Sequence, residues 1–281
     1  MSSALVTGAS TGIGRATALR LDRAGWRVFA GVRREADAEA LRADASEQLT
    51  AVMVDVTDPD QIAAAAERIG AALDGARLDG LVNNAGVAIP SPLETMPIED
   101  FRRQVEVNLT GQVAVTQAML PLIRGAAAGR IVFISSIGGR IAFPFTGAYH
   151  AAKFGVEAVG DSFRQELRRW GISVSIVEPG SIDTPIWGRG TAAADEIGER
   201  AGGSQEALYG KAIERYRKLM EKTGERGIPP EKVAAAVEHA LSARRPRARY
   251  LVGFDAKIQA RVKIVIPTPV WDRVVARMMG I

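Results

Sequence analysis

Residues 4–14 read Ala-Leu-Val-Thr-Gly-Ala-Ser-Thr-Gly-Ile-Gly, a short apolar run followed by a turn that contains three glycines. The run is typical of a buried strand, and residues 13–24 continue with the spacing of an amphipathic helix. Glycines in such a turn adopt positive φ, let the backbone approach a pyrophosphate and allow helix and strand to pack closely. The stretch therefore predicts a strand–turn–helix unit at the start of an α/β fold.

The same turn is a candidate anion site. A helix that begins directly after it presents free N–H groups and the positive end of its dipole to a phosphate. The spacing is G-x-x-x-G-x-G, whereas the commonest dinucleotide fingerprint is G-x-G-x-x-G, and a tight turn without a ligand is the alternative. We expect a dinucleotide to bind along Gly8, Ser10, Thr11, Gly12, Ile13 and Gly14.

Strand-like and helix-like segments alternate along the rest of the chain. Further apolar runs lie at 28–32, 51–54, 81–82, 131–134, 174–177 and 250–252, and stretches of helical length at 59–73, 98–123, 149–170 and 231–242. The runs are nearly continuous rather than alternating, which indicates strands buried on both faces. We therefore predict one α/β domain over residues 1–281, a Rossmann-type, doubly wound, mainly parallel sheet of seven strands with helices on both faces. Ligands of such a sheet bind at the carboxyl ends of its strands.

Composition narrows the classes of function. The 281 residues include no cysteine and two histidines, which excludes disulfides and a thiol nucleophile and argues against a metal site. A net charge of +4 on a chain of this length gives no sign of nucleic-acid binding. We find no secretory signal and no apolar stretch of roughly 18 residues, so the expected location is the cytoplasm.

Two segments depart from the alternating rhythm. Residues 185–229 form a long excursion that contains Trp187, Tyr209 and Tyr216, and an excursion at the ligand-facing edge is more often functional than idle. Residues 254–281 form a tail that pairs apolar and basic side chains. The tail would suit weak peripheral contact with a membrane, although a helix that closes the substrate pocket or packs on a neighbouring subunit is the favoured interpretation.

The end of the second strand predicts which dinucleotide binds. An NAD site places an acid there for the ribose 2′-hydroxyl, and an NADP site places arginine for the 2′-phosphate. Val32 stands at the acid's position, and Arg33 and Arg34 follow. We predict a preference for NADP(H) through Arg33, with NAD(H) possible. The alternative is that these arginines only solvate a loop.

A serine, a tyrosine and a lysine complete a candidate catalytic set. Ser136 lies just past the fifth strand, while Tyr149 and Lys153 are four residues apart on a helix and share a face. An ammonium beside a phenol favours the phenolate, which lowers the tyrosine pKa from about 10 towards the working range. A tyrosine tuned in this way serves as a general acid or base.

Taken together, these motifs resemble the classical short-chain dehydrogenase/reductase family, from about residue 3 to residue 253. The resemblance rests on the glycine turn, Asp55, Asn83-Asn84-Ala85-Gly86, Asn108, Ser136, Tyr149, Lys153, and Pro179-Gly180 with Ile182 and Thr184. It implies that Asp55 and Val56 hold the adenine, that Asn83, Ala85 and Gly86 shape the cofactor floor, and that Pro179, Gly180, Ile182 and Thr184 lie at the nicotinamide. It also implies hydride transfer with Tyr149 as acid or base, Ser136 on the substrate oxygen, Lys153 on the ribose and Asn108 holding a water.

The segment between Ser136 and Tyr149 indicates the substrate class. Ile141, Phe143, Pro144 and Phe145 lie there, and the segment also resembles the 17-beta-hydroxysteroid and retinol dehydrogenase branches. We expect a hydrophobic alcohol or ketone, with a sugar or a 3-oxoacyl thioester as the next classes. A non-catalytic dinucleotide-sensing regulator and a purely structural partner are further alternatives, as are the epimerase/dehydratase relatives. By analogy we expect a homodimer or homotetramer.

Overall fold

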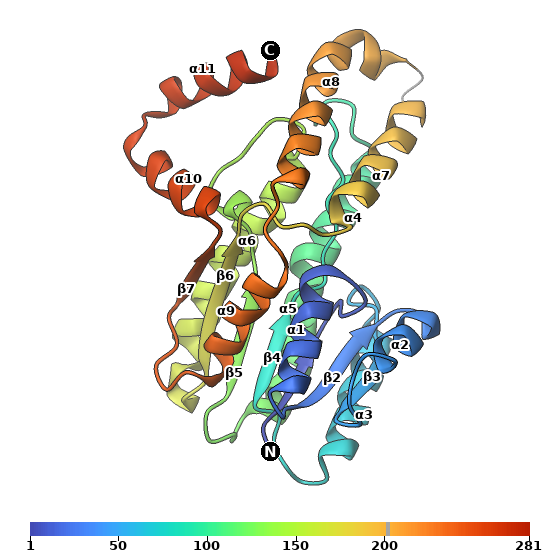
Figure 1. Ribbon diagram of the computed structural model, residues 1–281, viewed down its shortest axis with the longest axis vertical. Helices are drawn as coiled ribbons and strands as arrows, with labels where there is room; N and C mark the ends of the chain where they lie inside the picture. The colour runs from blue at the N-terminus through green and yellow to red at the C-terminus, as the bar shows by residue number, and fades with distance from the viewer. Residues whose placement is uncertain (201–202) are drawn as a thin grey trace.

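The computed structural model describes residues 1–200 and 203–281, with the side chains of residues 187, 204, 225 and 264 left aside. Its centre is one sheet of seven strands in the order β3-β2-β1-β4-β5-β6-β7, with every pairing parallel. The strands are β1 Ser3–Val6, β2 Arg27–Val32, β3 Leu49–Met53, β4 Gly80–Asn83, β5 Arg130–Ile134, β6 Ser173–Pro179 and β7 Arg249–Val252. The predicted doubly wound sheet is confirmed (Figure 1).

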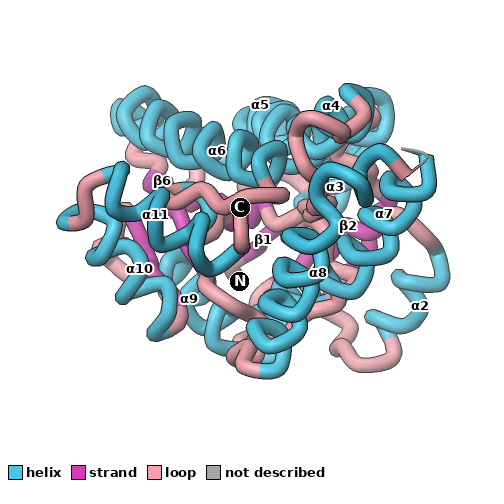
Figure 2. Tube along the Cα trace, turned by 90° about the horizontal axis from the view of Figure 1, so that it is seen from above, coloured by secondary structure: helices cyan, strands magenta, loops and turns pink. Residues whose placement is uncertain are grey.

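Helices cover both faces of the sheet because every parallel crossover carries a helix across it. The helices of the domain body are α1 Gly12–Arg23, α2 Glu35–Arg42, α3 Pro59–Leu73, α4 Ile98–Val105, α5 Gly111–Ile123, α6 Gly147–Glu166 and α9 Glu231–Ser242. Side chains of α1, α2 and α9 share one buried apolar cluster, and those of α3, α5 and α6 share the other. The view from above shows these layers on opposite sides of the strands (Figure 2).

The strand order reverses beside β1, which pairs with β2 on one side and with β4 on the other. Thr7, directly after β1, ties the two neighbouring turns together. Its Oγ1 accepts hydrogen bonds from the backbone N–H groups of Asn84 at 3.0 Å and Ala85 at 3.1 Å. The Asn84 side chain donates in return to the Thr7 carbonyl at 2.9 Å. The crevice that such a reversal creates is therefore rigid at its base.

Several elements differ from the sequence prediction. The stretch 98–123 is helical throughout but contains a wide π turn at Glu106–Thr110, which separates α4 from α5. The excursion 185–229 is not a loop, because it forms α7 Ile186–Arg200 and α8 Ser204–Glu225. The tail forms two further helices, α10 Phe254–Val265 and α11 Thr268–Met279. Glycines and charged side chains interrupt the apolar spacing of α7 and α8, whereas a helix in the tail was the favoured interpretation of the sequence.

Helices α8 and α11 lie beyond the carboxyl ends of the strands and pack on each other there (Figures 1 and 2). A third apolar cluster joins them, with Ala212 and Tyr216 from α8, Val275 and Met279 from α11, and Phe145 from the loop before α6. Within the described residues no helix combines the length and the apolar character needed to cross a bilayer.

Candidate active site

One cavity of about 920 Å³ opens at the carboxyl ends of the strands. It brings together residues that are far apart in the chain, as the sequence predicts for a crevice at the strand reversal. The predicted residues that line it are Gly8, Ser10, Thr11, Gly12, Ile13, Arg33, Asp55, Val56, Ala85, Gly86, Asn108, Ser136, Tyr149, Lys153, Pro179, Gly180, Ile182 and Thr184. Its lining combines the polar groups of the glycine turn with a set of apolar side chains.

The glycine turn fits a phosphate group because side chains would fill it. A Cβ on Gly8, whose φ is +64°, would lie 2.9 Å from the Ala85 Cα, and one on Gly12 would lie 3.0 Å from Thr184 Cγ2. No side-chain hydrogen bond from Thr11 caps the N-terminus of α1. The N–H groups of this helix therefore face the cavity as an anion site, which suits a dinucleotide pyrophosphate.

Two predicted cofactor residues do not line the cavity. Asn83 is fully buried within β4, where its amide donates to Thr116 Oγ1 at 2.8 Å. Gly14 packs beneath the turn, and a Cβ there would lie 2.2 Å from the Gly8 carbonyl oxygen. Both residues pack beneath the residues that line the cavity and support them. The motifs alone do not show which of their residues face the ligand.

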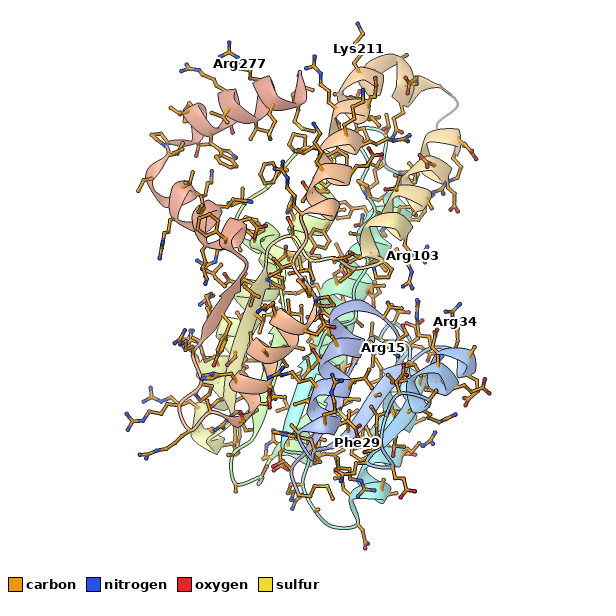
Figure 3. The ribbon with its side chains drawn as sticks, viewed as in Figure 1. Arg15, Phe29, Arg34, Arg103, Lys211 and Arg277 are labelled. Atoms are coloured by element: carbon orange, nitrogen blue, oxygen red, sulfur yellow. The ribbon has the colours of Figure 1, made fainter. Side chains whose placement is uncertain are left out.

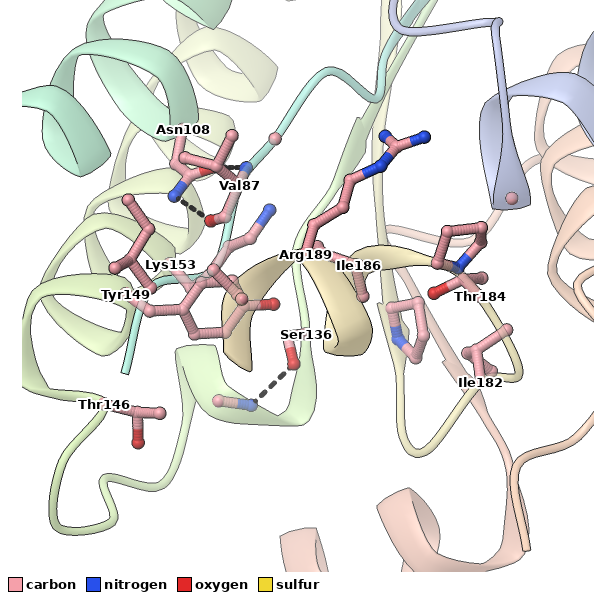
Figure 4. A pocket seen from close by; sticks show the side chains of 18 of the residues that line it. Val87, Asn108, Ser136, Thr146, Tyr149, Lys153, Ile182, Thr184, Ile186 and Arg189 are labelled. Atoms are coloured by element: carbon pink, nitrogen blue, oxygen red, sulfur yellow. Dashed lines mark hydrogen bonds between the residues drawn. The ribbon is translucent and has the colours of Figure 1, made fainter. Parts of the chain in front are cut away.

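The two arginines after β2 separate. Arg33 lines the cavity and lies 3.8 Å from Asp55, whereas Arg34 makes two hydrogen bonds of 2.7 and 2.8 Å to Asp37. Hydrogen bonding from Arg34 lowers the pKa of Asp37, with smaller contributions from the charges of Arg189 and Arg33. Arg189, on α7, also lines the cavity (Figure 4). It is a second guanidinium beside Arg33, and it was not predicted from the sequence.

Ser136, Tyr149 and Lys153 lie together at the centre of the cavity (Figure 4). Ser136 follows β5, and its hydroxyl accepts the Gly138 N–H at 3.0 Å, which fixes its orientation. Tyr149 and Lys153 lie one turn apart on α6, with the ammonium 5.7 Å from the centre of the phenol ring. The ammonium donates to the Ile134 carbonyl at 2.7 Å and is almost fully buried. The predicted catalytic set is thus assembled in one place.

The direction of the Tyr149 pKa differs from the sequence expectation. Burial raises the pKa of Tyr149, and a hydrogen bond with Ser136 offsets this in part. Burial also lowers the pKa of Lys153 to about 8, although the charge of Glu157 acts in the opposite sense. The expectation that Lys153 lowers the pKa of Tyr149 was wrong for this structure, because burial disfavours the charged phenolate.

Asn108 lies in the π turn between α4 and α5 and is fully buried. Its side chain accepts from the Val87 N–H at 2.8 Å and donates to the Val87 carbonyl at 2.8 Å. A Cβ on Gly86 would lie 2.9 Å from Asn108 Oδ1, so the loop after β4 is seated on this side chain. These contacts show that Asn108 positions the loop after β4. The water that we expect Asn108 to hold stays a prediction.

A buried charged network lies behind Lys153. Glu178 on β6 is fully buried, accepts a hydrogen bond from Arg140 at 2.7 Å and forms an ion pair with Arg249 at 3.2 Å. Arg249 also bonds Glu157 at 3.1 Å. Burial raises the pKa of Glu157, which lies one turn beyond Lys153 on α6. The network joins β6, β7, α6 and the turn that follows Ser136.

The other end of the cavity is apolar, and the residues that line it come mainly from segments whose role the sequence left open. They include Phe143, Ile186, Tyr216, Leu219, Met220, Met278 and Met279. Of the predicted pocket residues, Phe143 lines the cavity, whereas Ile141 and Phe145 belong to the buried core. The Trp187 side chain lies outside the described part of the chain. The tail therefore closes the cavity through α11, as favoured from the sequence.

Comparison with known proteins identifies the family. The protein-family model described as "short chain dehydrogenase" matches residues 2–195 of this chain. The chain belongs to the short-chain dehydrogenase family. This short-chain dehydrogenase is 38% identical to retinol dehydrogenase 5 of Homo sapiens over 275 residues, 96% of this chain and 86% of the relative. It is 39% identical to 17-beta-hydroxysteroid dehydrogenase type 6 of Bos taurus over 278 residues, 97% of this chain and 87% of the relative.

A solved structure agrees with this membership. A short-chain dehydrogenase from Streptomyces avermitilis superposes with a TM-score of 0.76 at 30% identity, covering 99% of this chain and 95% of that one. The predicted family is confirmed, and with it an oxidoreductase that uses a nicotinamide dinucleotide. When bound, that cofactor supplies or accepts a hydride.

Proposed function

We propose that this short-chain dehydrogenase interconverts a hydrophobic secondary alcohol and its ketone, or a primary alcohol and its aldehyde, with NADP(H). The observation that carries the proposal is that Ser136, Tyr149 and Lys153 line the same cavity as the glycine turn and a set of apolar side chains. The relatives named as retinol and 17-beta-hydroxysteroid dehydrogenases support a lipid-like substrate.

In the direction of reduction, Tyr149 gives its phenol proton to the carbonyl oxygen, and Ser136 donates a hydrogen bond to the same oxygen. The ammonium of Lys153 stabilises the phenolate that is left behind. The glycine turn and the N-terminus of α1 hold the pyrophosphate, and Lys153 binds the nicotinamide ribose. Asp55 and Val56 hold the adenine, while Ile182 and Thr184 contact the carboxamide.

The test is a screen that follows NADPH oxidation with steroid, retinoid, quinone and aliphatic ketones or aldehydes, with sugars and a 3-oxoacyl thioester as competing classes. We expect the highest kcat/KM among the steroid or retinoid carbonyls, because the apolar end is built from aliphatic, aromatic and thioether side chains. Turnover confined to the thioester would contradict the proposed substrate class. Cofactor binding without turnover of any carbonyl compound would favour the alternative function, a non-catalytic dinucleotide-sensing regulator.

Cofactor preference is predicted to depend on Arg33. Arg33→Ala should raise the KM for NADPH by about 10- to 100-fold and leave the KM for NADH nearly unchanged, since a charge-assisted hydrogen bond is worth about 1.5–3 kcal/mol. Arg34→Ala is the matched control, because Arg34 is held by Asp37. Steady-state kinetics with both cofactors measures the effect. A wild-type preference for NADH, or equal effects of the two substitutions, would overturn the assignment.

The pH dependence follows from Lys153. With a pKa of about 8, this side chain carries its charge at lower pH and loses it at higher pH. We expect kcat for reduction to fall as the pH rises through about 8, because the phenolate left on Tyr149 loses its stabilising charge. Glu157→Gln should move the fall to lower pH, since the Glu157 carboxylate raises the pKa of Lys153. A fall that moves to higher pH would contradict this.

We also propose that the outer face of α11 makes weak contact with anionic lipid. Val270 and Val274 lie one turn apart on α11 and are exposed, and the same helix carries Arg273 and Arg277. Figure 3 shows Arg277 extending from this helix. Apolar and basic side chains on one exposed helix suit an interfacial position. Sedimentation with anionic vesicles should carry the protein down at low salt and less at high salt. No sedimentation at low salt would remove the proposal.

A further inference from the structure

Tyr216 on α8 places a phenol in the apolar end of the cavity. The residue is 6% exposed and belongs to the cluster formed by Phe145, Ala212, Val275 and Met279. The rings of Tyr216 and Phe145 meet edge to face with centres 5.7 Å apart. These contacts hold the ring in one orientation, and the residue lines the same cavity as Tyr149.

The hydroxyl of Tyr216 differs from those of the other tyrosines. The chain has four tyrosines. Tyr209 bonds Glu94, Tyr250 accepts the Arg247 N–H at 3.0 Å, and Tyr149 lies beside Ser136 at the reacting centre (Figure 4). Across residues 1–200 and 203–281 the Tyr216 hydroxyl has no hydrogen-bond partner, and it is not one of the fully enclosed polar atoms. The hydroxyl therefore points into the cavity.

An unpaired phenol in an apolar setting has a cost. Once a substrate excludes water from the cavity, a hydroxyl left without a hydrogen bond costs about 1–3 kcal/mol, so an occupant that pairs with it is favoured. The hydroxyls of Thr146 and Thr223 bond elsewhere, to His150 at 2.8 Å and to the Leu219 carbonyl at 2.7 Å, and neither bonds Tyr216. The neighbouring cavity residues Leu219, Met220 and Met279 offer only weak acceptors or none.

The surroundings keep this phenol neutral. Burial raises the pKa of Tyr216, and the nearby phenol of Tyr149 raises it further. The hydroxyl therefore remains a donor throughout the working pH range. Tyr216 and Tyr149 line the same cavity, so a substrate that reacts at Tyr149 can also reach Tyr216.

We propose that Tyr216 is a specificity-determining residue whose hydroxyl binds a second oxygen of the substrate. The inference rests on the proposed apolar alcohol or ketone substrate and narrows it. A substrate with a second hydroxyl or carbonyl, apart from the reacting group, can form a hydrogen bond with the Tyr216 hydroxyl. A hydrocarbon substrate whose only oxygen is the reacting one leaves that hydroxyl unpaired. The site therefore selects oxygenated, steroid-like substrates over monofunctional, retinoid-like ones, because unpaired buried polar groups penalise the analogue that lacks the oxygen.

The test compares rigid ketones that differ by one oxygen. 5α-Androstan-17-one is paired with its 3β-hydroxy derivative, in which the second oxygen is distant, and with its 16α-hydroxy derivative, in which it is adjacent. We expect wild-type kcat/KM to favour at least one hydroxy ketone about tenfold, which is the effect of one well-placed hydrogen bond. In Tyr216→Phe this ratio should fall to about one, while the KM for NADPH stays unchanged.

Tyr209→Phe is the matched control. Tyr209 lies on the same helix, outside the cavity residues, with its hydroxyl on Glu94. It should retain the wild-type ratio. Dissociation constants for the three ketones, measured by calorimetry with NADP⁺ present, give the same ratios without turnover. If no ketone is reduced, the proposed function fails, and calorimetry still tests Tyr216. A wild-type ratio near one for both pairs, or a ratio that survives in Tyr216→Phe, would overturn the inference.

Discussion

Tyr149→Phe is expected to lower kcat by about 10²–10⁴, which is the usual contribution of a positioned general acid or base. The phenylalanine ring keeps the packing on α6 and removes the oxygen that faces Ser136. The hydride donor remains bound, but the carbonyl oxygen then has no acid to protonate it. The measurement is steady-state reduction of the best ketone of the screen.

The KM for NADPH separates this effect from damage to the site. Lys153 keeps its bond to the Ile134 carbonyl in the variant, so the cofactor end of the cavity is unchanged and the cofactor KM should stay within about twofold. Fluorescence titration with NADPH checks binding directly. Activity within tenfold of the wild type would show that another group transfers the proton.

The parts of the site that the sequence predicts are those with local geometry. A glycine turn after a strand and a pair four residues apart on a helix have consequences that do not depend on the rest of the fold. Gly8, Gly12, Tyr149 and Lys153 accordingly line the cavity as predicted. Arg33 follows the same rule, because the end of β2 borders the strand reversal.

The parts that it does not predict depend on long-range packing. Nothing local distinguishes Asn83, which is buried in β4, from Ala85 two residues later, which faces the cavity. Tyr216 and Met279 reach the cavity only because α8 and α11 pack on each other beyond the sheet. The direction of the Tyr149 pKa likewise needs the degree of burial, which the spacing of a tyrosine and a lysine does not contain.

Glu178→Gln is expected to destabilise the protein by about 3 kcal/mol. Breaking one partner of a buried ion pair typically costs about 3–5 kcal/mol, because it leaves the other charge without compensation. The lower end applies here, since Arg249 keeps bonds to Asp161 at 2.7 Å and Glu157 at 3.1 Å. Arg140, on the turn after Ser136, loses its only ion pair within the described residues.

Urea unfolding at neutral pH measures the change as a lower midpoint with an unchanged slope, since the surface exposed on unfolding stays the same. Glu214→Gln is the control, because Glu214 pairs with Lys218 on the exposed face of α8 and such pairs contribute at most about 1 kcal/mol. A loss below 1 kcal/mol for Glu178→Gln would show that the carboxylate is not the centre of the network. Because Arg140 borders the Ser136 turn, a loss of kcat beyond the loss of folded protein would connect this network to the reacting oxygen.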